Sequence, residues 1–263
     1  MPSTNKSTSQ SASQSAAKYR APQDLLTGKV ILVTGAGDGI GAVAAKTYAA
    51  YGATVILTGK TIPKLEKVFD EIVEAKNPEP AIYPIDYTGA SVDHYATMAD
   101  TIEKNFGRLD GLLHNAAQLG LMTPLTSYTP EDWVKTLHTN LTAPFLLSQA
   151  LIPLLQKAEN ASIIFTTDKV GQNPNAYWGA YGVSKAGIDN LMVTLAEELD
   201  NTTNIRVNSI DPGAIRTALR RNAYPGEVPT EVPLAEAIMP SYLYLMGKDS
   251  LDINKTTIAA QSK

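Results

Sequence analysis

The sequence predicts an α/β protein in which a doubly wound, mainly parallel sheet of about seven strands carries helices on both faces. Short apolar, β-branched runs such as residues 30–33 recur along the chain, and each is followed by a longer segment with helical periodicity. Strands covered on both faces have this unbroken apolar character, whereas half-exposed strands alternate apolar and polar residues. Because right-handed crossovers join parallel strands, the alternation implies a doubly wound sheet.

The elements follow in order from residue 29. Apolar runs predict strands at residues 30–33, 54–57, 81–85, 109–114, 162–166 and 205–210, with 256–260 as a candidate closing strand. Helical patterns occupy residues 40–51, 62–75, 91–106, 131–157, 181–200 and 234–247. Pro144 and Pro153 are expected to bend the helix over 131–157, because proline removes a helical N–H.

Residues 1–22 differ in composition from the rest of the chain. They are rich in Ser, Gln, Thr and Ala and contain no apolar run. A secretory signal needs an apolar core of ~7–15 residues, so we expect a disordered tail. A transit peptide is the weaker alternative, because few basic residues are present. Residues 23–263 show no composition shift and no internal repeat, which predicts a single domain.

The composition argues against several classes of function. A net charge of −4 disfavours a nucleic-acid scaffold or a membrane-surface protein, since both need a basic surface. There are no cysteines, and His94, His114 and His138 lack the spacing of zinc ligands, so no metal site is expected. No segment approaches the ~20 apolar residues of a membrane span. We therefore expect a cytoplasmic protein with no nucleic-acid or membrane partner.

A glycine-rich turn follows the first strand. The segment Gly35-Ala36-Gly37-Asp38-Gly39-Ile40-Gly41 has the spacing G-x-x-x-G-x-G. Glycines make such a turn tight and let a pyrophosphate approach backbone N–H groups at the start of the next helix. The alternative is a plain strand-to-helix turn. Four glycines in seven residues at this position favour dinucleotide binding.

Residues after the next two strands bear on which dinucleotide binds. An acidic residue at the end of the second strand would bind the ribose 2′-hydroxyl of NAD, but Lys60 stands there and could pair with a 2′-phosphate. NADP is therefore the expected cofactor. NAD stays open as the alternative, because Asp38 occupies a place where a second basic residue often helps NADP. Asp86 and Tyr87 follow the third strand, where Asp86 could accept from the adenine amino group or simply cap a helix.

Tyr181 and Lys185 are four residues apart on a predicted helix, so they share one face. An ammonium beside a phenol favours the phenolate and lowers the tyrosine pKa from its usual ~10. A tyrosine tuned in this way can exchange a proton with an alcohol or a carbonyl near neutral pH. Taken alone, the pair also occurs by chance on many helices.

These motifs together resemble the short-chain dehydrogenase/reductase family, which has a Rossmann-like fold, over residues 25–260. The matching pieces are Thr34-Gly35, Gly39-Ile40-Gly41, Asn115-Ala116-Ala117, Asn140, Tyr181 with Lys185, and Pro212-Gly213 followed by Thr217. Within the family the chain is most similar to the YciK-type branch. That similarity is carried by residues 23–26, 38–41, 51–57, 178–181 and 238–240.

The resemblance implies a role for each matching position. Tyr181 would be the general acid/base, Lys185 would lower its pKa and hold the nicotinamide ribose, and Asn140 would anchor a water chain to Lys185. The hydride would pass between the nicotinamide and a carbonyl or alcohol substrate. The remaining positions would hold the cofactor. They are Asn115 and Ala116 on the adenosine side, and Pro212, Gly213, Ile215 and Thr217 around the nicotinamide amide and phosphates.

The chain departs from the family pattern at two positions. Ala117 replaces a common glycine, which is a mild change. Asp168 stands where the family has a catalytic serine that donates a hydrogen bond to the substrate oxygen. An ionised carboxylate cannot donate. At ~4 Å and an effective dielectric of ~20 it would also oppose Lys185 by about 4 kcal/mol, or roughly 3 pKa units.

Several outcomes remain open at Asp168. The carboxyl group could stay protonated and donate, Thr167 could supply the hydroxyl, Lys169 could neutralise the charge, or Asp168 could bind a cationic group on a substrate. Alternatively catalysis is lost, and the chain is a dinucleotide-binding or regulatory protein.

The substrate side is expected to lie under a lid near residues 214–233, bordered by Tyr177 and Trp178. The lid has a basic cluster that could attract an acidic group or be solvated, and it has no apolar run suited to a large lipid. Helices near 131–157 and 181–200 carry more apolar surface than one sheet face needs. Helices at these positions pair across a two-fold axis in the resembling family, so a homodimer or homotetramer is expected.

Overall fold

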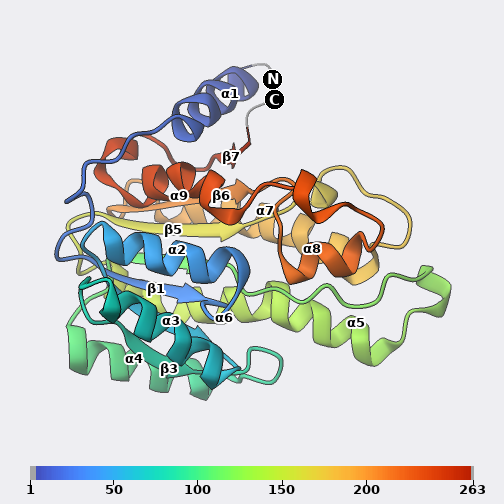
Figure 1. Ribbon diagram of the computed structural model, residues 1–263, viewed down its shortest axis with the longest axis horizontal. Coiled ribbons are helices and arrows are strands. Elements are labelled where there is room, and N and C mark those ends of the chain that lie inside the picture. Colours follow the sequence, from blue (N-terminus) through green and yellow to red (C-terminus); the bar gives the residue numbers. More distant parts are fainter. Residues whose placement is uncertain (1–3, 262–263) are drawn as a thin grey trace.

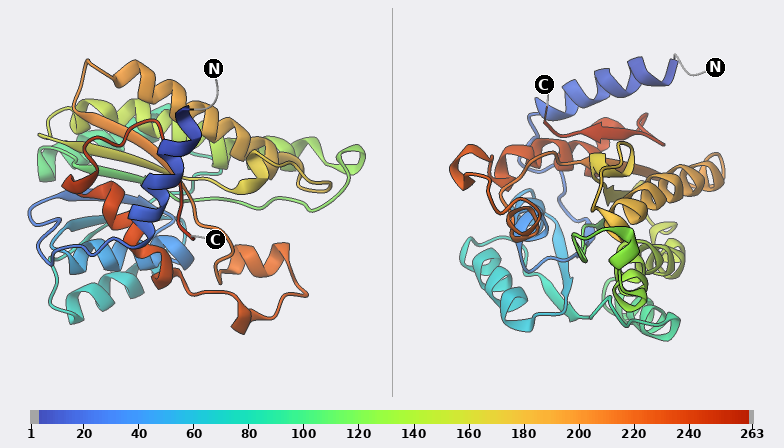
Figure 2. Two further views of the ribbon diagram at one scale, coloured as in Figure 1. Left: turned by 90° about the horizontal axis from the view of Figure 1, so that it is seen from above. Right: turned by 90° about the vertical axis from the view of Figure 1, so that its right-hand side faces the viewer.

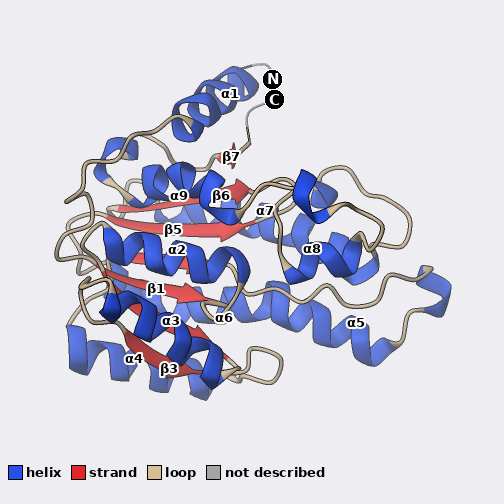
Figure 3. Cartoon of the chain, viewed as in Figure 1, coloured by secondary structure: helices blue, strands red, loops and turns tan. Residues whose placement is uncertain are grey.

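The computed structural model describes residues 4–261, and for residues 4–9 it describes the backbone alone. Seven parallel strands form one sheet in the order β3-β2-β1-β4-β5-β6-β7, which confirms the predicted fold class (Figures 1 and 3). The strands are β1 (Val30–Thr34), β2 (Thr54–Gly59), β3 (Ala81–Pro84), β4 (Gly111–His114), β5 (Ala161–Thr166), β6 (Ile205–Asp211) and β7 (Thr257–Ala259).

Helices cover both faces of the sheet (Figure 2). One face carries α2 (Gly39–Ala50), α3 (Ile62–Glu74) and α9 (Met239–Met246), and the other carries α4 (Val92–Phe106), α6 (Ala143–Leu155) and α7 (Gly179–Leu199). Strand β1 shows why its apolar run is unbroken. Ile31 and Val33 are buried in the first core and Leu32 in the second, because successive side chains point to opposite faces.

The chain reverses its direction of travel across the sheet between β1 and β4. The first three strands run outward to one edge, and the chain then returns to add β4 on the other side of β1. The loops after β1 and β4 therefore diverge at the carboxyl edge of the sheet, which is where open α/β sheets bind ligands. Beyond this edge lie α5 (Pro130–Leu137) and α8 (Ala218–Ala223) (Figure 1).

The helix predicted over residues 131–157 is interrupted just before Pro144, and it continues through Pro153. Helix α5 passes through a wide π-type turn at His138–Thr142 into α6. Pro144 lies in the first turn of α6 and has no N–H to donate to the carbonyl of Asn140, four residues earlier. Such π turns often occur at functional sites.

Residues 4–17 form a helix, α1 (Thr4–Ala17), so the prediction of a disordered tail is wrong for this segment. Ala12 and Ala16, one helical turn apart, are buried where α1 lies against α9 and β7 (Figures 1 and 2). The Ala259 N–H of β7 donates a 3.0 Å hydrogen bond to Ser13 Oγ. Alanine contributes little to hydrophobic periodicity, so the sequence pattern hides this docking face. Residues 1–3 of the predicted tail lie outside the described residues.

Across residues 4–261, every helix is too short or too polar to cross a membrane.

Substituting Ala16→Asp is expected to detach α1, because an unpaired carboxylate in this buried contact is unfavourable unless the helix moves into water. The melting temperature should fall by several degrees, since ~1 kcal/mol shifts it by ~2–4 °C in a domain of this size. Trypsin should also cleave faster after Lys18 and Arg20. Ser15 is exposed on the same helix, so Ser15→Asp is the matched control. Equal melting and cleavage of the two variants would contradict the role given to this contact.

Candidate active site

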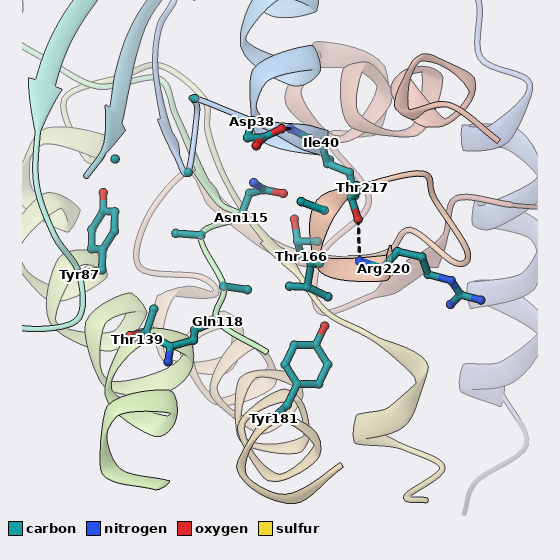
Figure 4. Close-up of a pocket in the computed structure, with 18 of the residues that line it drawn as sticks. Asp38, Ile40, Tyr87, Asn115, Gln118, Thr139, Thr166, Tyr181, Thr217 and Arg220 are labelled. Carbon is teal, nitrogen blue, oxygen red and sulfur yellow. Dashed lines mark hydrogen bonds between the residues drawn. The ribbon is translucent and has the colours of Figure 1, made fainter. Parts of the chain in front are cut away.

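A cavity of about 500 Å³ opens at the carboxyl edge of the sheet, within the ~300–1,000 Å³ typical of ligand sites. Its walls come from the loops after β1 to β6 and from the lid. Figure 4 shows the start of α2 at one side and Tyr181 at the opposite side. All the predicted site residues except Asn140 line it. They are Gly35, Asp38, Gly39, Ile40, Lys60, Asp86, Tyr87, Asn115, Ala116, Asp168, Tyr181, Lys185, Pro212, Gly213, Ile215 and Thr217.

The glycine turn is closed by a direct backbone contact. A Cβ on Gly41 would lie 2.2 Å from the Gly35 carbonyl oxygen, so only glycine allows the first turn of α2 to pack on the end of β1. Gly35 itself has φ 66°, a left-handed conformation that glycine adopts at no steric cost. The Thr34 hydroxyl then accepts hydrogen bonds from the N–H groups of Asn115 and Ala116, which joins this turn to the end of β4.

Two lysines and one aspartate lie at the glycine-turn end of the cavity. Asp38 caps α2 by accepting a 2.7 Å hydrogen bond from the Gly39 N–H. Its other oxygen is 2.5 Å from Lys64 Nζ, and this ammonium lowers the pKa of Asp38. Lys60 and Lys64 both line the cavity. Sequence reasoning missed Lys64. Its position in the first turn of the helix that follows Lys60 was the available signal.

Asp86 and Tyr87, which follow β3, form one wall of the cavity, and both make hydrogen bonds within it. Asp86 accepts a 3.0 Å hydrogen bond from the Thr88 N–H, the arrangement of a turn-forming aspartate. Tyr87 is buried, and its hydroxyl lies 2.5 Å from the Thr58 hydroxyl at the end of β2. Its ring also stacks on Tyr95 of α4. Tyr87 therefore lines the cavity with its hydroxyl already engaged by Thr58.

Tyr181 and Lys185 lie on the first turns of α7, and both are buried. Lys185 Nζ donates a 2.7 Å hydrogen bond to the Thr166 carbonyl at the end of β5 and lies 5.4 Å from the centre of the Tyr181 ring. The Tyr181 hydroxyl donates a 3.1 Å hydrogen bond to Asp168 Oδ2. The residue that departs from the family pattern is therefore in direct contact with the tyrosine.

The structure reverses the expected direction of the Tyr181 pKa. Burial raises this pKa well above the usual value, and the negative charge of Asp168 and the hydrogen bond to it raise it further. Burial also lowers the pKa of Lys185 to about 8, because an ammonium is disfavoured away from water. The sequence predicted that the Lys185 ammonium lowers the pKa of Tyr181. In the structure, burial and Asp168 raise this pKa by more than the ammonium lowers it.

Asn140 lies behind the cavity, in the π turn between α5 and α6. Its amide donates hydrogen bonds to the Gln118 carbonyl at 2.8 Å and to Ser184 Oγ at 3.0 Å, and its Oδ1 accepts from the Gln118 N–H at 2.8 Å. The side chain thus joins the loop after β4 to helix α7. Asn140 positions these two walls without touching the cavity.

Neither neighbour of Asp168 provides the alternatives considered from the sequence. Thr167 is buried, and its hydroxyl lies beside the Asp189 carboxylate rather than beside Tyr181. Burial raises the pKa of Asp189, and the contact with Thr167 partly offsets this effect. Lys169 is exposed and forms no ion pair with Asp168 among the described residues.

The lid residues lie over the same end of the cavity. Thr217 caps α8, because its hydroxyl accepts a hydrogen bond from the Arg220 N–H (Figure 4). Trp178 lies between Tyr181 and Tyr224, with ring centres 5.6 and 5.7 Å away. Tyr177 is 58% exposed and is not among the residues that line the cavity. Tyr224 belongs to the lid, and its contact with Trp178 depends on how the lid folds back.

A doubly wound sheet with a glycine turn facing a Tyr–Lys pair is the architecture of a short-chain dehydrogenase. The short chain dehydrogenase family model matches residues 29–227, and the chain belongs to this family. Within residues 4–261, no group of three or more His, Asp and Glu side chains is placed to hold a metal ion.

Three similar proteins bear out the predicted branch of the family. The uncharacterized oxidoreductase YciK of Escherichia coli K12 is 43% identical over 243 residues, covering 92% of this chain and 96% of that protein. A short-chain dehydrogenase structure from Pseudomonas syringae has 50% identity and a TM-score of 0.91, covering 93% and 99% of the two chains. Another, from Shigella flexneri and complexed with NADP, has 43% identity and a TM-score of 0.89, covering 92% and 100%.

Proposed function

We propose that the protein is an NADP-dependent oxidoreductase that transfers a hydride between nicotinamide and a carbonyl or alcohol group of a small molecule. One observation carries the proposal. A single cavity runs from the glycine turn and its two lysines to the buried Tyr181–Lys185 pair. This places a site for an anionic dinucleotide next to groups that can move a proton.

The residues present fit a dinucleotide with a 2′-phosphate. The Gly35–Gly41 contact packs the start of α2 against the end of β1 at the cavity, and the start of a helix favours a pyrophosphate, although the first N–H of α2 already donates to Asp38. Lys60 and Lys64 supply positive charge where NAD-binding proteins of this fold place an acid. Asp38 reduces this positive charge, because its carboxylate forms a salt bridge with Lys64. The Shigella flexneri relative complexed with NADP supports the same cofactor.

Bound NADPH would supply the hydride, and the chain would supply orientation and protons. Tyr181 would donate its hydroxyl proton to the substrate oxygen in reduction and accept one in oxidation. Lys185, with a pKa of about 8, can give up a proton near neutral pH and would restore that of Tyr181. Pro144 has no N–H to donate to the Asn140 carbonyl. This carbonyl would instead accept a hydrogen bond from a water, and that water would begin a path to Lys185.

The proposal includes a homodimer or homotetramer. Helices α5, α6 and α7 expose large apolar side chains, namely Val134, Phe145, Val183 and Val193, at 40–64% of their surface. Apolar surface on neighbouring helices is suited to a two-fold interface between copies.

A second candidate function is dinucleotide binding with little or no turnover. The hydrogen bond from Tyr181 to Asp168 favours it, because it engages the proton that Tyr181 would donate. The carboxylate also raises the pKa of Tyr181 and repels a developing alkoxide.

The cofactor assignment predicts that Lys60→Ala and Lys64→Ala each weaken NADPH binding by roughly 10- to 100-fold while leaving NADH binding nearly unchanged, because only NADPH has the 2′-phosphate. Dissociation constants from fluorescence titration would measure this. Lys67→Ala is the matched control, since Lys67 belongs to the same helix and lies outside the cavity. An unchanged NADPH/NADH affinity ratio in both cavity variants would exclude these lysines as the discriminating groups.

The assignment of Tyr181 predicts that Tyr181→Phe lowers kcat by ~10²–10⁴-fold on any carbonyl substrate that the protein reduces, with NADPH affinity retained. Single-turnover absorbance of NADPH would measure the chemical step. The exposed Tyr177 gives the matched control, Tyr177→Phe. Full activity of Tyr181→Phe would remove this residue from the proton transfer.

Substituting Asp168→Ser separates the two candidate functions. Serine restores a hydroxyl donor, so reduction of simple neutral ketones should rise roughly 10- to 100-fold. A parent protein that binds NADPH but reduces no carbonyl class, with activity appearing only in Asp168→Ser, would favour the non-catalytic candidate. Loss of an activity that the parent has would make Asp168 a working part of the site.

A further inference from the structure

Asp168 is a partly buried carboxylate without an ion-pair partner among the described residues. Its Oδ1 accepts a 3.0 Å hydrogen bond from the Val170 N–H, and its Oδ2 accepts from the Tyr181 hydroxyl. Lys185 is a buried ammonium that acts on Asp168, but it donates its hydrogen bond to the Thr166 carbonyl, and the two side chains do not form a salt bridge. A carboxylate held in a cavity with neutral donors alone is suited to a cationic ligand.

The lid does not supply that cation. Arg220 lines the cavity, but its guanidinium donates two hydrogen bonds to the Glu227 carboxylate, at 2.8 and 2.7 Å. Arg216 is exposed and donates to the Val232 carbonyl. The charge of Arg220 is thereby balanced within the lid, although it still acts on Asp168 from a distance.

Negative charge predominates around the proton-transfer pair. Asp168, Asp189 and Asp211 all lie close enough to Lys185 to raise its pKa against the lowering effect of burial. Lys185 is the buried ammonium among these three carboxyl groups, and the exposed Lys169 acts on Asp211 as well. A further positive charge next to Asp168 would balance this end of the cavity.

Aromatic rings border the same space. The ring centre of Trp178 lies 5.6 Å from that of Tyr181 and 5.7 Å from that of Tyr224, and both contacts are tilted. Aromatic faces attract cations, and ammonium sites are commonly built from such rings beside a carboxylate. Arg220 already lies 3.9 Å over the ring of Tyr224, which leaves Trp178 and Asp168 as the groups available to a ligand.

Resting on the oxidoreductase function proposed above, we propose that the substrates are α-amino ketones and the corresponding amino alcohols, with an ammonium on the carbon next to the reacting one. The Tyr181 hydroxyl and Asp168 Oδ2 are 3.1 Å apart. An oxygen and a nitrogen on adjacent carbons, turned to the same side, have a similar separation. The ketone oxygen would accept from Tyr181 while the ammonium donates to Asp168.

With an amino ketone bound, the Asp168 carboxylate would select the substrate instead of opposing the reaction. Alone, Asp168 repels the negative charge that develops on the substrate oxygen. An ammonium between them cancels the charge of Asp168 and stabilises the neighbouring oxygen in place of the missing serine hydroxyl.

The step balances for reduction. The carbonyl carbon gains a hydride from the nicotinamide, and the C=O π bond breaks toward oxygen. That oxygen takes the Tyr181 proton, which Lys185 and solvent replace. The C–N and N–H bonds of the substrate do not change, and NADPH is the only reductant required.

Three small ketones of nearly equal size provide the test. Aminoacetone, hydroxyacetone and butanone differ only in carrying an ammonium, a hydroxyl or a methyl group on the carbon next to the ketone. The full-length protein should reduce aminoacetone with a kcat/KM roughly 100-fold above that of butanone, and hydroxyacetone should fall between them.

Two variants report on Asp168 itself. Asp168→Asn keeps the shape and removes the charge, so the preference for aminoacetone over butanone should fall to within about 10-fold, mainly through KM. Asp168→Ser should lose aminoacetone reduction and gain butanone reduction. NADPH affinity measured on each variant verifies that it is folded, and the substrate ratio of the parent protein decides the matter if neither variant folds.

The outcomes separate the two proposals. Reduction of butanone as efficient as that of aminoacetone, or a preference for aminoacetone unchanged in Asp168→Asn, overturns the substrate class and leaves the oxidoreductase function standing. If the parent protein binds NADPH and reduces no ketone of any kind, the oxidoreductase function fails and the substrate class fails with it.

Discussion

The parallel pairing of β1 with β4 is the constraint on which the site depends. It brings Leu32 level with Leu112, although 80 residues separate them, and so places the ends of both strands at one edge. The Thr34 hydroxyl then accepts from two N–H groups of the segment after β4. Gly41 packs on Gly35 at the same edge, so the start of α2 faces the cavity. The diverging loops after β1 and β4 keep this cavity open.

The opposite wall of that gap depends on a buried polar arrangement. Asn140 joins the loop after β4 to α7, and α7 carries Tyr181 and Lys185 at its first turns. Both groups are held away from water, which raises the pKa of one and lowers that of the other. Asp168 adds a negative charge to this wall. The chemistry available there thus depends on which group balances that charge.

Much of the fold and the site could be predicted from local patterns. Unbroken apolar runs predict buried parallel strands, and the glycine spacing predicts a turn that only residues without a Cβ can form. The docking of α1 could not be predicted, because Ala12 and Ala16 carry little hydrophobic signal. The π turn also escaped prediction. Pro144 removes the N–H that would bond to the Asn140 carbonyl, but this alone does not show that the helix continues through a wider turn at residues 138–142.

The sequence by itself determined the order of elements, the glycine turn, the Tyr181–Lys185 face and the presence of an aspartate at residue 168, because each depends on residue type and short-range spacing. Tertiary structure alone decided how these groups act on one another. It placed Lys64 beside Asp38, put the Asp168 carboxylate on the Tyr181 hydroxyl, and reversed the expected direction of that tyrosine's pKa. Burial and charge separation depend on three-dimensional distances, which no sequence spacing specifies.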